Sequence, residues 1–386
     1  MLEWWNRFRQ SVQALWQKLR YWRQPKWPVD NPPIHLFVLP AHNGDAMLLE
    51  YLGQDQQFHR IWIDGGLVKS YMEKGRTVLQ NLSQEETPID LMIVTHIDQD
   101  HIGGVLAFVN DKQIPKDFVR RFWFNSGLLI ASQFDHEPDR RRDVSFQTIG
   151  FQTRSLQQGL KLEDFLLKSK RWHEKPIQTP HIEEIAGAKL QILSPNEIAL
   201  QRLDREWEAE EASKSRSVPD VDYGESIETL ADRKEEEDSS IANASSIAFL
   251  FTLRHKRILF LGDSHPSDIV QALQKAGYSK KKRLKLDYVK LSHHASKRSI
   301  SYELLALIDC QNFIISTDGS RHGLPHKEAL ARVVLAPSRD RGERLYFLFN
   351  HRNPHLQSIF PESEQIRYNF QTIYPPEGQE GILVSF

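Results

Sequence analysis

The stretch "VTHIDQDHIGG", residues 94–104, places four ionisable side chains directly after an apolar run. They are His96, Asp98, Asp100 and His101. The preceding residues 91–94 are apolar and typical of a buried strand. In an extended chain, side chains two residues apart point the same way, so we expect the first three to face one pocket. Carboxylate and imidazole groups are common ligands of divalent metals, so the stretch predicts a metal site at a strand end.

A polar turn that caps the next helix is the alternative interpretation of this stretch. One Asp is enough for a cap, so capping does not explain two histidines and two acids within six residues. His101 reaches the same pocket only if the chain turns there. Gly103 and Gly104 permit a tight turn and close packing of the following helix. We therefore favour the metal site.

The composition is that of a globular protein. The chain has 386 residues, 40% of them apolar and 26% charged, which excludes a wholly disordered chain. The formal net charge is -1, so any surface that binds nucleic acid must be local. The single cysteine, Cys310, excludes an internal disulfide and a cysteine-rich zinc site. With no apolar run of ~18–20 residues and no signal-peptide pattern, we expect a cytoplasmic protein.

Residues 1–31 predict an amphipathic helix of their own, rich in Trp and Arg and ended by prolines from Pro25 onward. Either this helix docks on its own domain or a sister subunit, or residues 1–24 recruit the chain to a membrane surface or a protein partner. The remainder, residues 34–386, alternates strands with helices. That pattern predicts one α/β (α+β) domain, a sheet-rich core covered by helices.

An acidic segment at about residues 204–238 does not fit this core. It has fourteen acids, five bases and few large apolar residues, which predicts a solvated insert or flexible loop. We hypothesise that it is an autoinhibitory lid that repels anionic substrates and is released by a partner or a protease. A passive, solubilising insert is the alternative. The basic residues in it that offer cleavage sites are Lys214, Arg216, Arg233 and Lys234.

Three further strand ends carry acids or histidines. The sequences "WIDGG", "ILFLGDS" and "YVKLSHHAS" supply Asp64, Asp263 and the pair His293 and His294. Each feature alone is common, because an Asp often starts a turn and a histidine pair often lies at a sheet edge. Together with residues 94–104 they make four such strand ends, and this number favours one shared metal site.

These motifs resemble the metallo-β-lactamase fold, an αββα sandwich of hydrolases. More narrowly, "THIDQDHIGG", "LGD", "LSHHAS" and "RHGLPHKEAL" are similar to the metallo-hydrolase domain of bacterial competence-type DNA-uptake channels and to related defence-associated proteins. The family pattern is His-x-His-x-Asp-His, and Asp98 stands where the second histidine is usual. The resemblance implies two divalent ions, Zn²⁺ or Mn²⁺, and a carboxylate at position 98 shifts the preference toward Mn²⁺.

The resemblance also implies a role for each residue. His96 and Asp98 would bind one ion, Asp100 and His101 the other, and Asp263 would bridge both. One of His293 and His294 would complete the second site while the other faces the substrate, and Asp64 would orient a ligand histidine. The third-motif histidine of the family has no clear counterpart, because neither His136 nor His173 follows a convincing strand. The residues we expect to take part in catalysis are Asp100, His294 and His326, with His322 near the last.

Basic residues near the histidine pair indicate the substrate. Lys297 and Arg298 follow the pair, and "SKKKRLK" before it brings Lys282 and Arg283. These residues predict attraction of a phosphate backbone, whereas a solvated guard of a sheet edge is the alternative. We expect a phosphodiesterase or nuclease of a defence or DNA-processing system, in which metal ions lower the pKa of water from ~15.7 toward ~7. The alternatives are a small-molecule phosphodiesterase or lactonase, and an effector that acts mainly through assembly.

Overall fold

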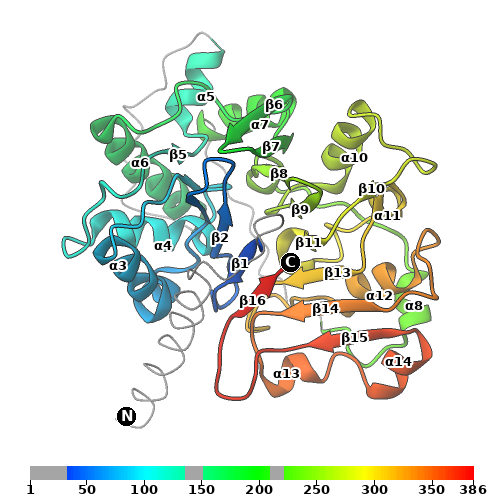
Figure 1. Cartoon of the computed structure of the whole chain (residues 1–386). Coiled ribbons are helices and arrows are strands. Elements are labelled where there is room, and N and C mark those ends of the chain that lie inside the picture. Colours follow the sequence, from blue (N-terminus) through cyan, green and yellow to red (C-terminus); the bar gives the residue numbers. More distant parts are fainter. Residues whose placement is uncertain (1–32, 135–150, 209–220) are drawn as a thin grey trace.

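Two β-sheets pack face to face and helices cover both outer faces (Figure 1). The computed structural model describes residues 33–134, 151–208 and 221–386. This arrangement is the α/β sandwich expected from the sequence, and the expected fold class is confirmed. The predicted N-terminal helix, residues 1–31, lies outside the described residues. Within them, no helix has the length and apolarity needed to cross a bilayer.

The first sheet has six strands in the order β16-β1-β2-β3-β4-β5, antiparallel from β16 to β3 and parallel from β3 to β5. Their bounds are β1 (His35–Val38), β2 (Met47–Leu52), β3 (Phe58–Ile63), β4 (Leu91–Ile93), β5 (Phe122–Trp123) and β16 (Ile382–Ser385). The strand expected at residues 91–94 is therefore present as β4.

The second sheet has eight strands in the order β15-β14-β13-β11-β9-β8-β7-β6, parallel from β15 to β9 and antiparallel from β9 to β6. Their bounds are β6 (His181–Ile185), β7 (Ala188–Ser194), β8 (Ala248–Leu253), β9 (Lys256–Phe260), β11 (Tyr288–Lys290), β13 (Asn312–Ile315), β14 (Leu345–Phe349) and β15 (Phe370–Ile373). Two short strands, β10 (Leu284–Lys285) and β12 (Ile308–Asp309), pair separately.

Helices form the two outer layers. Those packed on the first sheet are α3 (Arg76–Gln84), α4 (Gln99–Asn110), α5 (Gly127–Gln133), α6 (Phe151–Ser169) and α7 (Glu197–Glu208). Those packed on the second are α8 (Ile227–Ala231), α10 (Pro266–Lys275), α11 (Tyr302–Leu307), α12 (Lys327–Leu335) and α13 (Pro354–Gln357). The remaining helical segments are α2 (Val68–Ser70), the π-helical turn η1 (Tyr71–Gly75), α9 (Ile241–Ala244), the turn η3 (Ser292–Ala295) and α14 (Glu362–Arg367).

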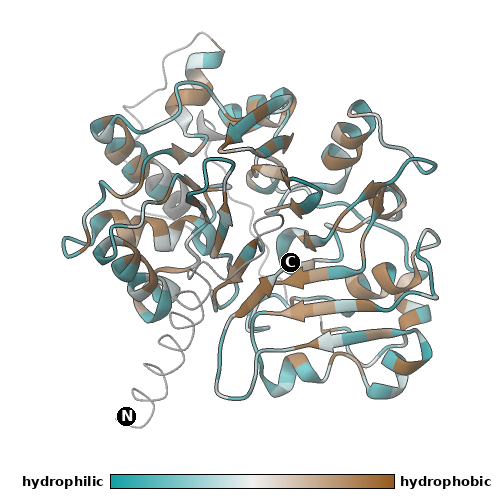
Figure 2. Ribbon diagram, in the orientation of Figure 1, coloured by the Kyte–Doolittle hydropathy of each residue, from teal (hydrophilic) through white to brown (hydrophobic). Residues whose placement is uncertain are grey.

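Alternation along the strands creates the core between the sheets. In β8, Phe249 and Phe251 point toward the first sheet, whereas Leu250 points toward the helices of the second. The same strands appear apolar in Figure 2, while the outer faces of the helices are polar. Burial of each large apolar side chain contributes ~1.5–3 kcal/mol, so the inner faces hold the two sheets together.

Parallel strands bring their carboxyl ends to one edge of each sheet. In the first sheet β3 and β4 end next to each other, and in the second sheet β9, β11 and β13 do so. Asp64 and His96 follow the first two strands, and Asp263 and His293 follow β9 and β11. Chain segments far apart in sequence thus deliver their polar residues to one place between the sheets.

The expectation that residues 96–100 are extended is wrong. Helix α4 begins at Gln99, and Asp98 is its N-terminal cap residue with an extended backbone (φ −67°, ψ 142°). Asp100 and His101 therefore lie in the first helical turn, so Asp100 does not share the direction of His96 and Asp98. The Asp98 side chain does not cap the helix, which leaves its carboxylate for another role.

The interpretation of the acidic segment as a solvated loop is wrong for α8, whereas residues 232–237 are mostly exposed and lie outside helices and strands. Ile227 and Leu230 of α8 are fully buried in the core of the second sheet, and α8 packs on α12. The start of the segment forms the end of α7. Residues 209–220 lie outside the described residues. Because the segment is acidic overall, its apolar residues at helical spacing were overlooked. These apolar residues bury one side of α8.

Close approach of two backbones positions α4. Gly65 donates from its amide to the carbonyl of His101 (2.8 Å), and Gly104 donates to Gly66 (2.8 Å). A Cβ atom at Gly104 would overlap the carbonyl oxygen of Gly65. The expected role of this glycine in close helix packing is confirmed, and the contact places His101 beside Asp64.

Gly104→Ala should lower the free energy of unfolding by about 1–3 kcal/mol, because the added methyl group forces α4 away from β3. Chemical denaturation of the purified protein measures this change. Gly224→Ala is the matched control, since a Cβ atom there meets no heavy atom within 4 Å. Equal stability of the two variants would contradict the proposed packing constraint.

Candidate metal centre

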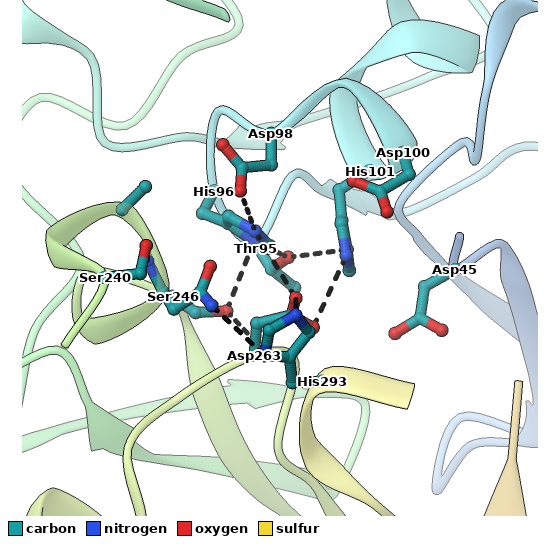
Figure 3. A network of polar contacts seen from close by, with 12 residues as sticks. Asp45, Thr95, His96, Asp98, Asp100, His101, Ser240, Ser246, Asp263 and His293 are labelled. Carbon is teal, nitrogen blue, oxygen red and sulfur yellow. Dashed lines mark hydrogen bonds and ion pairs between the residues drawn. The ribbon is translucent and has the colours of Figure 1, made fainter. Parts of the chain in front are cut away.

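Asp263 lies at the centre of a cluster of imidazole rings (Figure 3). Its Oδ1 is 3.4 Å from Nε2 of His101, and its Oδ2 is 3.8 Å from Nε2 of His96. The Nε2 atoms of His293 and His294 are each 4.0 Å from the same Oδ2. Two ligands about 2.1 Å from one tetrahedral ion are about 3.4 Å apart, so these spacings leave room for cations between the donor atoms.

Buried donor atoms in this cluster lack partners. Nε2 of His96, His101 and His294 and Oδ1 of Asp263 have no hydrogen-bond partner among the described residues. An unsatisfied buried polar group costs about 1–3 kcal/mol, so four of them at one point would be strongly destabilising on their own. Divalent cations would satisfy all four. The residues present therefore fit a metal centre.

The remaining ring nitrogens are held by neighbouring groups. His101 donates from Nδ1 to Oδ2 of Asp64 (2.9 Å), and His294 donates from Nδ1 to the carbonyl of Ser316 (2.8 Å). Because the proton is on Nδ1, the lone pair on Nε2 points into the cluster. Asp64 therefore orients His101, whose role as a metal ligand stays a prediction.

His96 is oriented through a hydroxyl group. Thr95 donates from Oγ1 to Oδ2 of Asp64 (2.8 Å), so Oγ1 accepts from Nδ1 of His96 at 3.0 Å. The amide of Thr95 donates to the other oxygen of Asp64 (2.8 Å). One buried carboxylate thus orients His96 and His101 together.

Electrostatics in the cluster favour positive charge. Burial alone would raise the pKa of Asp263, but His101, His293 and His294 outweigh it and hold that pKa well below its usual range. Burial also opposes protonation of His293, yet Asp263 and Asp238 raise its pKa to about 9. The carboxylates therefore attract cationic groups despite the low polarity of the site, which is the condition that bound cations would meet.

Two groups of potential ligand atoms lie beside Asp263, and each would form a metal position. At the first, Asp98 Oδ2 lies 3.8 Å from His96 Nε2. At the second, Asp100 Oδ2 lies 3.7 Å from His294 Nε2. Ligand atoms of His96, His101 and Asp263 lie within 4.8 Å of one another, as do those of Asp100, His101 and His294. The structure brings together the seven predicted ligands, whose roles as ligands remain predictions.

Several residues of the site were missed in the sequence. Lys290 of β11 forms a fully buried ion pair with Asp45, whose Oδ1 is 3.5 Å from Nδ1 of His294. Asn43 donates to Oδ2 of Asp100 (2.9 Å). In the sequence, the lysine inside the apolar run of β11 could have indicated a buried ion pair. Asn43 and Asp45 had no such signal, because Asn-Gly-Asp is also an ordinary turn sequence.

Residues 280–285 were expected to form a basic surface next to the metal site, but they lie elsewhere. Arg283 donates to the carbonyls of Ile308 (2.9 Å) and Ser338 (2.8 Å), next to the start of β13. The arrowheads of β13 and β14 point away from the side where β10 lies (Figure 1). Lys282 precedes Arg283 in the same turn. Strand β11 runs from the end of the sheet where Lys282 and Arg283 lie to the end where the cluster lies. The strand therefore separates these two residues from the cluster.

Lys297, Arg298 and His326 do lie on the same side as the cluster. The amide of Lys297 donates to Nδ1 of His326 (3.2 Å), and Arg298 pairs with Glu236 (3.3 Å). His322 is exposed in the preceding turn. His173 bonds the carbonyl of Lys175 and belongs to none of the potential ligand groups among the described residues, which exclude His136.

The sequence comparison agrees with this geometry. The profile of the Metallo-beta-lactamase superfamily matches residues 59–157. The matched residues include the stretch from His96 to His101. No curated protein matches the chain. The profile match and the cluster of ligand side chains support a metal-dependent hydrolase, whereas the narrower resemblance to DNA-uptake and defence-associated proteins remains a prediction.

Solved structures of low sequence identity resemble the superfamily domain as a whole. One is the metallo-beta-lactamase fold protein YhfI from Bacillus subtilis, with 9% identity, a TM-score of 0.42, and coverage of 92% of this chain and 99% of YhfI. Zn²⁺-bound PqqB from Methylobacterium extorquens has 11% identity and a TM-score of 0.39, covering 91% and 99%. A diphosphatase of the PhnP family has 12% identity and a TM-score of 0.38, covering 92% and 98%.

Asp263→Ala should reduce the divalent metal bound by the purified protein, because both positions lose their shared carboxylate. Metal analysis after chelation and reloading measures this loss. Asp309→Ala removes a carboxylate at the opposite end of the second sheet and should bind metal like the wild type. Retention of the wild-type metal content in Asp263→Ala would contradict the assignment of this centre.

Proposed function

We propose that the protein is a metal-dependent phosphodiesterase that acts on nucleic acid. The observation that carries this proposal is one buried carboxylate, Asp263, surrounded by four imidazole nitrogens and flanked by the carboxylates of Asp98 and Asp100. Divalent ions held there would supply activated water at neutral pH and neutralise the oxygens of a phosphodiester. Three carboxylates make the donor set hard, which suits Mn²⁺ as well as Zn²⁺.

The side chains around the centre fit an anionic substrate. Lys297 and Arg298 follow the turn that carries the histidine pair, so their positive charges lie on the side from which a phosphodiester would approach. Charges in such a position attract the phosphate backbone. Their pairing with Glu328 (4.0 Å) and Glu236 (3.3 Å) leaves the surface mixed in sign, so a polyanion must displace acidic groups to bind.

His326 is our candidate for the acid. Its Nδ1 accepts the amide hydrogen of Lys297, so in the neutral ring the proton is on Nε2. We propose that this Nε2–H donates its proton to the leaving alkoxide oxygen. Since both His293 and His294 direct Nε2 toward Asp263, the geometry favours a ligand role for each and leaves proton donation to His326.

The test is turnover by the purified protein, reloaded with Mn²⁺ or Zn²⁺, on single- and double-stranded DNA, RNA and a chromogenic phosphate bis-ester. Cleavage of nucleic acid and bis-ester supports the proposal. Turnover confined to small esters or lactones favours the alternative of a small-molecule hydrolase. Absence of any turnover by metal-loaded protein favours an effector that acts through assembly.

Replacing Lys297 and Arg298 together by Ser should weaken binding to long nucleic acid and reduce its salt dependence, since each lost phosphate contact removes roughly 0.7–0.9 from the slope of log K against log salt. Binding assays over a range of salt concentrations measure both effects. The control replaces Lys280, Lys281 and Lys282 by Ser and should behave like the wild type. The proposed substrate surface is wrong if only the control loses affinity.

We also propose that the acidic segment restrains the binding of nucleic acid. This role is now limited to the acids beside Lys297 and Arg298. Glu236→Gln should increase binding of nucleic acid, most at low salt, because its carboxylate no longer competes for Arg298. Glu235→Gln is the control, since Glu235 accepts from the amide of Tyr302 (2.8 Å) instead. Equal binding by Glu236→Gln and the wild type at all salt concentrations would reject this restraint.

The cellular setting is proposed on the sequence alone. We propose a cytoplasmic protein of a bacterial defence or DNA-processing system that residues 1–24 recruit to a partner or to a membrane surface. Cleavage by an activating protease would act within residues 204–238, where Lys214 and Arg216 are candidate positions.

A further inference from the structure

We infer that Asp238 positions His293 as the missing ligand of the first metal position, so that one end of the acidic segment is part of the metal centre. The inference rests on the metal centre of the proposed function but is independent of the substrate. It begins with the contacts of Asp238, whose role the sequence did not show.

The carboxylate of Asp238 is held by three donors. Oδ2 accepts from Nδ1 of His293 (3.1 Å) and from Nδ2 of Asn243 (2.6 Å), and Oδ1 accepts from the amide of Ser240 (3.0 Å). The amide of Asp238 in turn donates to the carbonyl of Arg298 (3.2 Å). Both the backbone and the side chain of Asp238 are therefore fixed, and the carboxylate can fix the ring that it contacts.

The hydrogen bond from His293 determines where its other nitrogen points. With the proton on Nδ1, the Nε2 lone pair faces Oδ2 of Asp263 at 4.0 Å. His293 and His294 have left-handed backbones (φ 46° and 53°), which are uncommon for residues other than glycine. This turn lets two consecutive side chains reach the same carboxylate.

Packing explains why His293 in particular needs a positioning residue. The side chain of His294 is 2% exposed and held by surrounding residues, whereas that of His293 is 29% exposed. A partly exposed ring retains rotational freedom unless a hydrogen bond removes it. Asp238 supplies that bond, in the way that Asp64 does for the fully buried His101.

With His293 as a ligand, the two metal positions also have the same number of protein ligands. The second position has Asp100, His101, His294 and the shared Asp263. Without His293 the first position has His96, Asp98 and Asp263, one protein ligand fewer. Four protein ligands at each position result if His293 takes the place of the third-motif histidine, for which the sequence offers no clear counterpart.

The neighbouring acids hold the segment against the domain. Glu235 accepts from the amide of Tyr302 in α11 (2.8 Å), and Glu237 accepts from the amide of Ser267 in α10 (2.9 Å). Carboxylates at helix N-termini are stabilising, because they satisfy amides that have no partner within the helix. These contacts keep Asp238 next to His293.

The experiment titrates metal into chelator-treated full-length protein. Mn²⁺ binding followed by electron paramagnetic resonance and Zn²⁺ binding followed by calorimetry give the number and affinity of the sites in the wild type, Asp238→Ala, Asp238→Asn and Glu237→Gln. We expect two ions in the wild type. In Asp238→Ala we expect one ion with unchanged affinity and one bound about 10- to 100-fold more weakly.

The other variants separate positioning from folding. Asp238→Asn keeps one oxygen, which can accept from His293 in place of Oδ2 but then leaves the amide of Ser240 without its acceptor, so its loss of affinity should be smaller than that of Asp238→Ala. His293→Ala should weaken the same single site. Glu237→Gln removes the adjacent charge but keeps an oxygen that can accept from the amide of Ser267, so it should bind both ions like the wild type. In the Zn²⁺-loaded wild type, nitrogen NMR should show a single proton on the His293 ring, at Nδ1.

Two ions bound with unchanged affinity in Asp238→Ala would overturn the inference, as would equal weakening of both sites. A wild type that binds no divalent metal would overturn the inference and the proposed function together. A wild type that binds two ions but cleaves no phosphodiester would refute the proposed function alone, because the titration of Asp238→Ala still decides the role of Asp238.

Discussion

Burial of the Asp263 carboxylate is the constraint on which this structure depends. The residue is 3% exposed, and a charge removed from water costs several kcal/mol unless charges and hydrogen bonds compensate it. Four imidazole rings approach it, and three of them present an Nε2 atom with no hydrogen-bond partner among the described residues. These buried donor atoms have no partners among the described residues, and divalent cations would satisfy them.

Meeting that constraint requires both sheets. The first sheet brings His96 and the buried Asp64, and the second brings Asp263 and the histidine pair. The apolar layer between the sheets holds them face to face, and the buried pair of Lys290 and Asp45 joins them next to the cluster. A purely apolar contact would let the two sheets slide past each other. A buried ion pair is favourable in one geometry only, so it fixes the position of one sheet on the other.

The acidic segment shows how composition can mislead about role. Its charges predict a solvated loop, yet each of the four consecutive acids from Glu235 to Asp238 has a specific partner. Two accept from helix amides, one pairs with Arg298 and one holds His293. A segment rich in carboxylates can therefore be as well ordered as an apolar one where donors are placed to meet it.

The sequence by itself determined the fold class, the strand at residues 91–94, and the identity of the clustered acids and histidines. Those inferences succeed because apolar periodicity and strand-end residues are local signals, and because parallel strands bring their ends together. The start of α4 at Gln99 was missed, since Asp98 fits both an extended chain and a helix cap. Only the tertiary structure decided that Arg283 lies across the sheet from the cluster, that Lys290 pairs with Asp45, and that Asp238 orients His293. Each of these contacts joins residues from different elements, and their distances depend on how the sheets and helices pack, which local sequence does not encode.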